Sequence, residues 1–326
     1  MLLAATLTGA AEDKAFSYTP ELHGVIRARW EMNTSTGDQR FNVRNARLSV
    51  GGKIHPSISY FFQTEYDKSE GKSSMIQILD AYGRFGIVKG LYVQAGQFRM
   101  PFGVEPFRAP ANYIFANRSF MGKQVMNYRA VGAKVGYAIP KTPLTLEFGV
   151  FNPYTITFTH GQKWGKDVAY AGKASLKLPE GFGISAGYAS IKPNDKNLRA
   201  NIIDAAMSWE NKNVLAAAEY MFKNYCRGGH ESNHSYVVYV DWHKAVKLGA
   251  FNRWSIQGRF DGMTEHWNIE SSRQDPKRNR LTVGSTLTCS YKAVHADVRV
   301  NYEKYFGYKE KGYSPDQFVI ETVFRF

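Results

Sequence analysis

The segment "QFVIETVFRF", residues 317–326, separates its side chains into two faces with a period of two. The apolar face consists of the even-numbered residues Phe318, Ile320, Phe324 and Phe326. Thr322 interrupts this face, while the opposite face carries Glu321 and Arg325. Because successive side chains of a β-strand point to opposite sides of a sheet, the segment is predicted to be a strand with one apolar and one ionic face.

The same period recurs along the whole chain. In "HADVRVNYEKY", residues 295–305, apolar side chains again share one side and charged or amide side chains the other. About sixteen such segments begin near residues 22, 43, 56, 75, 90, 128, 144, 168, 183, 201, 214, 235, 253, 280, 294 and 317. Their connectors alternate between short turns such as "PKTP" and long polar loops such as "WNIESSRQDPK". An even number of antiparallel strands with this alternation is typical of an outer-membrane barrel.

The composition narrows the class of protein. The chain has 326 residues, and no run approaches the roughly 18 apolar residues of a membrane-spanning helix. Lys and Arg number 42 against 28 Asp and Glu, so anionic partners are favoured. In residues 1–20 the stretch "TGAA" precedes the first charges, and we expect a residual signal or a disordered N-terminus there. Residues 21–326 contain no linker and are expected to form a single domain.

Backbone hydrogen bonding explains why these strands should close on themselves. In hydrocarbon every N–H and C=O group needs a partner within the protein, so a sheet in a membrane cannot keep open edges. A soluble β-sandwich could alternate in the same way, but sixteen strands would divide into two or more domains. We therefore predict an all-β fold, a transmembrane antiparallel β-barrel of 16 strands with short periplasmic turns and longer extracellular loops.

The alternation also predicts the inside of the barrel. If the apolar sides face lipid, the inner wall receives equal numbers of acidic and basic side chains and is nearly neutral. Sixteen strands leave an aqueous channel, so this polar wall predicts a water-filled pore. The surplus of positive charge is then expected in the loops and turns.

Residues 99–127 form the longest connector, which is the third long loop and joins the fifth and sixth predicted strands. A long loop that is rich in aromatic residues is more typical of a functional segment than of a disordered one. Its large aromatic side chains, which need a surface to pack on, are Phe102, Phe107, Tyr113, Phe115 and Phe120. We expect the loop to fold inward against the barrel wall and to narrow the pore.

The stretch from Arg99 to Arg129 is strongly basic. Its cationic residues are Arg99, Arg108, Arg118, Lys123 and Arg129, and Glu105 is its one carboxylate. Arginine presents a planar fork that suits phosphate and carboxylate oxygens, and anion-selective pores are lined by such groups. Together with Arg47 and Arg84 of the wall, these residues are the candidate anion-binding and pore-lining set. For each arginine the alternative is that it pairs with a wall carboxylate, such as Glu65 or Asp80, and pins the loop.

Four stretches carry a family resemblance. The runs "GQFRMPFGVE" (96–105), "NRSF" (117–120) and "RAVGAKVGY" (129–137), with "FNVRNARLSVGGKIHPSISYFFQTEYD" upstream, resemble the phosphate-selective porin O and P family. The resemblance implies a sixteen-stranded outer-membrane channel of a Gram-negative bacterium, assembled as a homotrimer. It also implies that the third loop folds inward and that basic residues conduct small anions.

Three departures from the family pattern matter. Asn117 stands where an acid is frequent and Ala130 where Asp is frequent, while Arg99 matches the loop-entry motif at a position where Lys is common. The run "RAPAN", residues 108–112, replaces a Ser-rich segment. These differences concern the phosphate specificity that the resemblance implies rather than the channel itself.

Several motifs for other functions lack their structural context. "HESNH" at 230–234 fits the zinc-protease pattern, but predicted strands flank it and leave no room for the helix which that site needs. "GISAG" at 183–187 fits the nucleophile motif of hydrolases, yet strand alternation continues through it. Cys226 and Cys289 are expected at different heights and should remain thiols. The basic residues follow no nucleic-acid-binding fold. We expect no enzyme, no metal and no cofactor.

The sequence thus predicts a passive diffusion channel for small hydrophilic solutes, with phosphate or pyrophosphate as the leading anions. Its expected partners are membrane lipid, lipopolysaccharide and small anionic solutes, with no nucleic acid. One alternative is a sugar or peptide channel in which the loop aromatics stack on solute. Another is a barrel that serves mainly as an anchor or adhesin.

Overall fold

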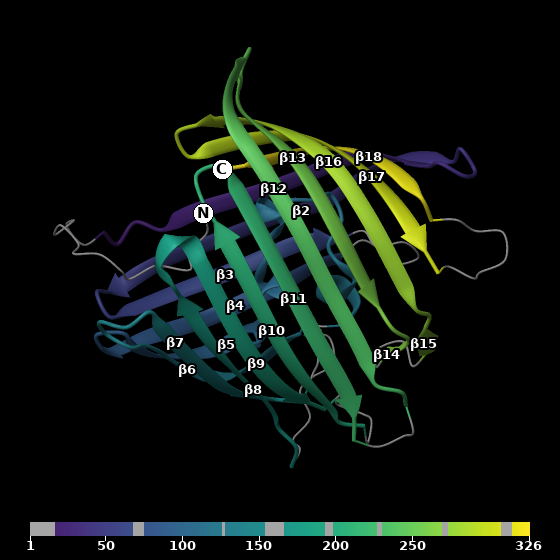
Figure 1. Cartoon of the computed structure of the whole chain (residues 1–326). Helices are drawn as coiled ribbons and strands as arrows, with labels where there is room; N and C mark the ends of the chain where they lie inside the picture. Colours follow the sequence, from purple (N-terminus) through teal and green to yellow (C-terminus); the bar gives the residue numbers. More distant parts are fainter. Residues whose placement is uncertain are drawn as a thin grey trace.

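The computed structural model describes residues 17–67, 75–125, 128–153, 166–192, 198–226, 230–268, 273–307 and 315–326. Within these ranges sixteen antiparallel strands close into one barrel, as predicted (Figure 1). A separate two-stranded hairpin, β14–β15, lies between β13 and β16 in the chain. The expected signal segment falls almost entirely outside the described residues, which start at Ser17.

The barrel strands follow one another in sequence around the wall, and β1 pairs with both β2 and β18 to close it. Their bounds are β1 Glu21–Asn33, β2 Gln39–His55, β3 Ile58–Asp67, β4 Met75–Val88, β5 Leu91–Arg99, β6 Arg129–Ala138, β7 Leu144–Phe151, β8 Ala169–Lys177, β9 Phe182–Ile191, β10 Ala200–Glu210, β11 Val214–Tyr225, β12 Asn233–Leu248, β13 Phe251–Met263, β16 Arg278–Tyr291, β17 Val294–Phe306 and β18 Gln317–Arg325. The hairpin consists of β14 (His266–Asn268) and β15 (Arg273–Asp275).

Each strand presents its apolar face outward and its charged face inward. On the outside, Phe148, Ile203 and Met207 keep more than half of their side-chain surface exposed, as lipid-facing residues of a barrel would. On the inside, charged side chains such as Asp261 and Glu321 are fully buried. The ionic face of the C-terminal segment therefore faces the interior of the barrel.

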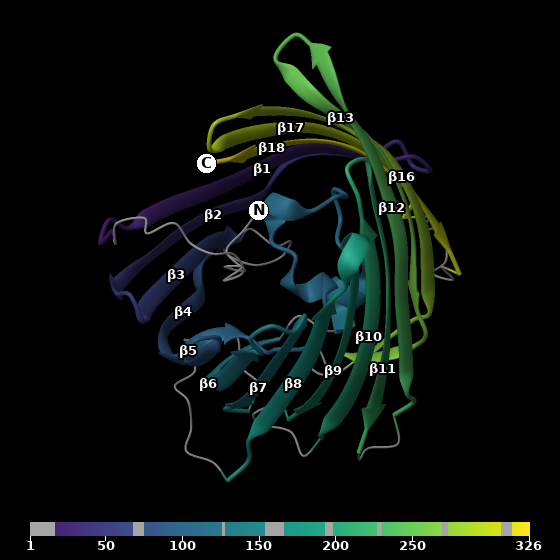
Figure 2. The same cartoon turned by 60° about the vertical axis from the view of Figure 1, so that its left-hand side comes forward.

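The segment between β5 and β6 lies inside the barrel rather than outside it (Figure 2). It contains three short helical turns, η1 (Glu105–Phe107), η2 (Pro110–Asn112) and the π-helical η3 (Met121–Val125). The largest buried apolar cluster includes Phe102, Phe115 and Phe120 of this segment, packed with inward residues of the wall. The predicted inward fold of the third loop is confirmed.

The rejected motifs adopt the structure expected from the strand pattern. His230 and Glu231 precede β12, and His234 lies within it, so "HESNH" is not helical. Ser185 of "GISAG" lies within β9. Cys226 and Cys289 are free thiols. No helix among the described residues is long and apolar enough to cross a bilayer.

Candidate functional site

The candidate site is the narrow part of the barrel beside residues 100–125, which we call the constriction loop. The chain reaches this loop from Arg99 at the end of β5 and leaves it into β6. Within the described residues, its hydrogen bonds to the wall involve β8, β10, β11, β12, β13, β16, β17, β18 and β1, and none involves β2, β3 or β4. The loop is therefore attached to most of the wall, from β8 round to β1, but not to β2–β4.

Carboxylate and amide side chains of the wall accept the N–H groups of the loop. Asp204 accepts from Gly103 N–H at 2.9 Å, and Glu219 accepts from the next two backbone N–H groups at 2.7 and 2.8 Å. Asp261 accepts from Phe120 N–H at 2.8 Å. A loop without regular secondary structure must find partners for its backbone groups, and here the wall supplies them.

Basic side chains of the wall donate to the carbonyl groups of the same loop. These bonds run from Lys173 to Gly103 O, Arg325 to Ala111 O, Arg299 to Tyr113 O, Arg27 to Ala116 O, Arg259 to Asn117 O and Arg280 to Arg118 O, over 2.5–2.7 Å. The arginines also pair with wall carboxylates, for example Arg280 with Asp261 and with Glu303, each at 3.0 Å. These wall charges are thus neutralised and hold the loop.

The loop's aromatic side chains divide into two groups. Phe102, Phe115 and Phe120 are between 2% and 6% exposed and pack against the wall. Tyr113 is half-buried, and the Arg27 guanidinium lies 4.8 Å from its ring centre. Phe107 is 39% exposed. Most of the aromatic surface is therefore used to fix the loop.

Three cations in or beside the constriction loop, namely Arg99, Arg118 and Lys123, have few partners. Arg99 makes no ion pair with the described residues, and its buried Nη1 has no acceptor among them. Arg118 donates to Glu105 O at a long 3.4 Å, while its buried Nε lacks an acceptor in the same part of the chain. Lys123 is exposed and forms no ion pair with a described residue. These three side chains contrast with the paired arginines of the wall.

The other four basic residues of the predicted set have partners. Arg129 pairs with Asp80 at 3.1 Å, and Arg47 pairs with Glu65 at 2.9 Å. Arg84 donates to the Gln94 side chain at 2.8 Å and lies over the Tyr92 ring. Arg108 donates to the Tyr239 hydroxyl and is 3.6 Å from a Glu105 oxygen.

Arg99, Arg118, Arg129 and Arg47 nevertheless belong to one electrostatic cluster, in which Arg99 experiences the charges of the other three. Two carboxylates, Asp80 and Glu65, are paired with members of this cluster. Four guanidinium groups against two carboxylates leave an excess of positive charge in this cluster. Low-dielectric walls concentrate such an excess into the channel.

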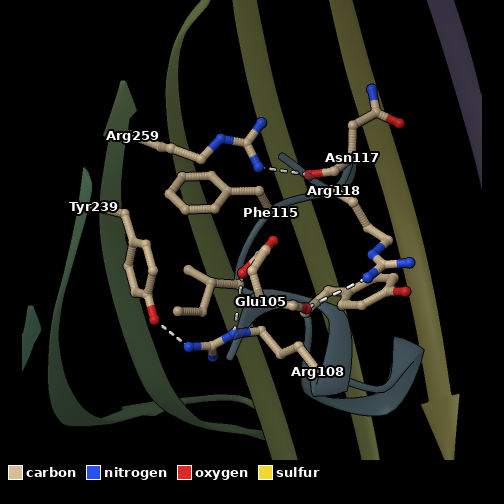
Figure 3. A pocket seen from close by; sticks show the side chains of 9 residues that line it. Glu105, Arg108, Phe115, Asn117, Arg118, Tyr239 and Arg259 are labelled. Atoms are coloured by element: carbon tan, nitrogen blue, oxygen red, sulfur yellow. Dashed lines mark hydrogen bonds and ion pairs between the residues drawn. The ribbon is translucent and has the colours of Figure 1, made fainter. Parts of the chain in front are cut away.

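A small pocket lies behind the loop, between it and strands β12 and β13 (Figure 3). Figure 3 shows the guanidinium of Arg108 between Glu105 and Tyr239, and the guanidinium of Arg259 beside the Phe115 ring, 4.6 Å from its centre. The side chain of Arg118 reaches the opposite side of this pocket. The pocket is therefore filled mainly by contacts that hold the loop to the wall.

The β14–β15 hairpin supports the far end of the loop. It contacts η3, and His266 Nε2 lies 3.1 Å from Lys223 Nζ, which also donates to the Tyr128 hydroxyl at 3.0 Å. Burial, and then the charge of Lys223, lower the pKa of His266 to about 4, so its imidazole is neutral at neutral pH. The sequence identified this segment only as a long polar loop.

Arg280 and Arg44 are two further basic residues that the predicted anion-binding set does not contain. Arg280 is buried on the inner face of β16, where strand alternation indicates an inward side chain. Arg44 lies at a β-bulge in β2, which a strict alternation does not reveal.

The comparisons with known proteins agree with this architecture. The chain resembles OmpF of Salmonella typhi, solved with daunomycin, at 15% identity and a TM-score of 0.65 over 94% of this chain and 97% of that one. It also resembles the anion-selective porin of Comamonas acidovorans, at 14% identity and a TM-score of 0.59 over 94% and 98%. A trimer form of OmpT from Vibrio cholerae gives 9% identity and a TM-score of 0.61 over 94% and 99%. A comparison with curated protein sequences finds no match.

The match to a family model shows more than a likeness of fold. The family model described as phosphate-selective porin O and P matches residues 24–244, which include β2–β6 and the whole constriction loop. The barrel, the inward loop and this match identify an outer-membrane porin, a channel rather than an enzyme. The chain belongs to the phosphate-selective porin O and P family.

Proposed function

We propose that this porin admits small hydrophilic solutes by passive diffusion and prefers anions, with phosphate and pyrophosphate as the leading candidates. The observation that carries the proposal is the pair Arg99 and Arg118. Their charges act on each other, and each has a buried donor with no acceptor among the described residues. The family to which the chain belongs is described as phosphate-selective, which points in the same direction.

An anion would correct two unfavourable features of this pair. Like charges close together repel, and a buried N–H donor without an acceptor costs about 1–3 kcal/mol. An oxyanion between Arg99 and Arg118 would accept from both guanidinium groups and reduce their repulsion. Arg129 and Arg47 keep their carboxylate partners, so they are expected to strengthen the field rather than to contact the solute first.

The aromatic side chains of the loop give little support to a sugar or peptide channel. Stacking on a solute needs an exposed ring, whereas Phe102, Phe115 and Phe120 are buried against the wall. Phe107 is exposed, and the Lys173 ammonium lies 5.2 Å from its ring centre. One exposed ring beside a cation is a weak platform for a neutral sugar.

We place the channel in the outer membrane of a Gram-negative bacterium, in contact with lipid and lipopolysaccharide, and propose that it assembles as a homotrimer. The apolar outer wall supports the lipid contact. The trimer form of OmpT, a protein of similar fold, supports the assembly. Chemical cross-linking of the detergent-extracted protein should give a ladder that ends at three subunits; a ladder that ends at one subunit would contradict the homotrimer.

The proposed selectivity can be measured directly in a planar bilayer. The zero-current potential in a potassium chloride gradient reports anion against cation preference, and added phosphate should block the chloride current at millimolar concentration. Arg118→Ala and Arg99→Gln should each weaken the phosphate block about tenfold, as expected for the loss of one charge-assisted hydrogen bond. Lys89→Gln, which removes an exposed charge from the turn after β4, is the matched control.

Cation selectivity of the wild type would contradict the proposed function. Anion selectivity without phosphate block would leave a general anion pore and remove the phosphate preference. If Arg118→Ala changed the stability of the loop but left the zero-current potential and the block unchanged, Arg118 would hold the loop and would not line the path.

A further inference from the structure

A polar cluster lies on the outer face of the barrel, where β8, β9 and β10 run side by side and lead into long connectors (Figure 2). The register places Tyr170, Ser190 and Asn201 next to one another on this face. Ser190 donates to Asn201 Oδ1 at 2.8 Å, and the Tyr188 hydroxyl donates to the same oxygen at 3.2 Å. Because the lipid-facing band of a barrel is apolar and tyrosines gather at its borders, the cluster marks the level at which the hydrocarbon ends.

Two cations extend the cluster toward the connectors. Arg199 donates to Ser190 Oγ at 3.0 Å, and its guanidinium lies 5.8 Å from the ring centre of Tyr170. Lys192 pairs with Asp167, and Arg199 is 4.0 Å from the other oxygen of the same carboxylate. Lys192 and Arg199 therefore share one acid, and both side chains keep part of their surface exposed. The group that these three residues form has a net positive charge and can accept a further anion.

The outer face is hollowed next to this cluster, on the side toward the middle of the membrane. The groove is lined mainly by Phe148, Tyr170, Gly172, Ala174, Ala186 and Tyr188. In the register, Gly172 lies between Phe148 and Tyr188, so the absence of a side chain at Gly172 leaves a space between the two rings. Ala174 and Ala186 pair with each other and continue this floor of small residues.

The groove and the cluster are continuous, because two tyrosines belong to both. Tyr170 lines the groove and lies beneath the guanidinium of Arg199. Tyr188 lines the groove and donates to Asn201 of the cluster. One molecule with an apolar chain and an anionic head could therefore occupy both places at once. That combination describes a lipid with a phosphate-bearing headgroup.

We propose that the cluster and the groove bind the lipid A part of lipopolysaccharide, with a phosphate at Arg199 and Lys192 and an acyl chain over Gly172. The guanidinium fork would take two phosphate oxygens, and the ammonium would act as a point charge. The choice of lipid follows from the end of the barrel at which the cations lie. Long connectors of such barrels face the cell exterior, and lipopolysaccharide forms the exterior leaflet of an outer membrane. The site rests on the proposed outer-membrane placement and lies outside the pore.

The test uses protein that has been extracted in detergent, freed of bound lipid and titrated with lipid A that carries two phosphates. Native mass spectrometry counts the bound lipid. Arg199→Gln and Lys192→Gln should each weaken the binding about tenfold, as expected for the loss of one charge-assisted contact. Lys244→Gln is the matched control, because Lys244 is an exposed cation beside two tryptophans near the short-turn end of the wall.

A second variant tests the groove without removing a charge. Gly172→Leu should also weaken lipid A binding about tenfold, because a Cβ there already lies 3.5 Å from the Phe148 ring and the rest of the side chain would fill the groove. Gly258→Leu is its control, since an added Cβ at that position of β13 meets nothing within 4 Å. Heat-modifiable migration on a gel verifies that each variant has formed a barrel before the titration.

Three results would overturn the site. The first is lipid A binding by Arg199→Gln and Gly172→Leu that is as tight as binding by the wild type. The second is equally tight binding of phosphatidylglycerol, which would make the groove a site for any anionic lipid. The third is a shorter cross-linking ladder for Gly172→Leu than for Gly258→Leu, which would make this face a contact between copies of the chain. All variants should keep the zero-current potential of the wild type, so failure of the lipid site is distinct from failure of the proposed anion preference.

Discussion

Lys123 is a cation whose charge should depend on pH within the working range of the channel. Its pKa is lowered to about 8 by its enclosure in the barrel and by the positive charges of Arg44, Arg280 and Arg29. Below that pH the ammonium is charged, and above it the side chain is neutral. Anion selectivity should therefore decline between about pH 7 and about pH 9, whereas Lys123→Arg should hold its selectivity there because arginine stays protonated.

The zero-current potential, recorded across this range for both proteins, checks this expectation. Lys123→Gln serves as the control, since it should show the low selectivity at every pH. A wild-type potential that stays constant from about pH 7 to about pH 9 would contradict a lowered pKa for Lys123.

The charged residues of the site could be predicted from the sequence, but their partners could not. The loop stretch contains Arg99, Arg118 and Lys123, and their number against one carboxylate predicts an anion site. The sequence could not tell them from Arg129, which pairs with Asp80, because that pairing joins strands far apart in the chain. Arg44 was missed because a bulge shifts the alternation by one residue, and nothing in the local sequence marks the shift.

The constriction loop shows, at the scale of an element, how an irregular segment can be held rigidly. N–H groups of the loop donate to wall carboxylates, and C=O groups of the loop accept from wall arginines. The charged side chains of the wall therefore supply hydrogen-bond partners for the loop backbone. The sequence predicted that the loop folds inward from its length and its aromatic residues. It could not predict the attachment, since each bond joins the loop to a strand more than 50 residues away.

Asp261 is the residue on which this attachment should depend most. It is fully buried, accepts from Phe120 N–H at 2.8 Å, and pairs with Arg259 at 3.1 Å and with Arg280 at 3.0 Å. Asp261→Ala would leave two buried arginines short of a counter-charge, and breaking such a buried pair costs about 3–5 kcal/mol. We expect a loop that protease cleaves and a current with frequent brief closures.

Asp67→Ala is a control for that change, because Asp67 is an exposed acid at the end of β3. It should leave the loop resistant to protease and the current steady. An Asp261→Ala protein with the wild-type cleavage rate and a steady current would show that the remaining wall contacts hold the loop without it.

The barrel fold was easier to predict from the sequence than the attachment of the loop or the partners of single residues. All sixteen strands lie where the alternation places them, because a lipid-facing side and a water-facing side force a period of two on every strand. The strand order follows directly, since neighbouring antiparallel strands joined by short turns leave few other topologies. How the first and last strands pack together was harder to predict from the sequence, because it depends on a contact between residues far apart in the chain.

That contact is between Gly24 of β1 and the C-terminal Phe326 on the outer face of the seam. Gly24 N–H donates to Phe326 O at 2.8 Å, and a Cβ added at Gly24 would lie 2.1 Å from Cζ of the Phe326 ring. Gly24→Val should therefore displace the ring and destabilise the closed barrel by about 1–3 kcal/mol, the usual cost of overpacking. Gly258→Val on β13 is the matched control, because an added Cβ there meets nothing within 4 Å.

Heat-modifiable gel migration should show Gly24→Val unfolding at a lower temperature than Gly258→Val, since the seam is where the sheet would otherwise have open edges. Equal unfolding temperatures for the two variants would mean that backbone pairing between β1 and β18 closes the barrel without the terminal ring.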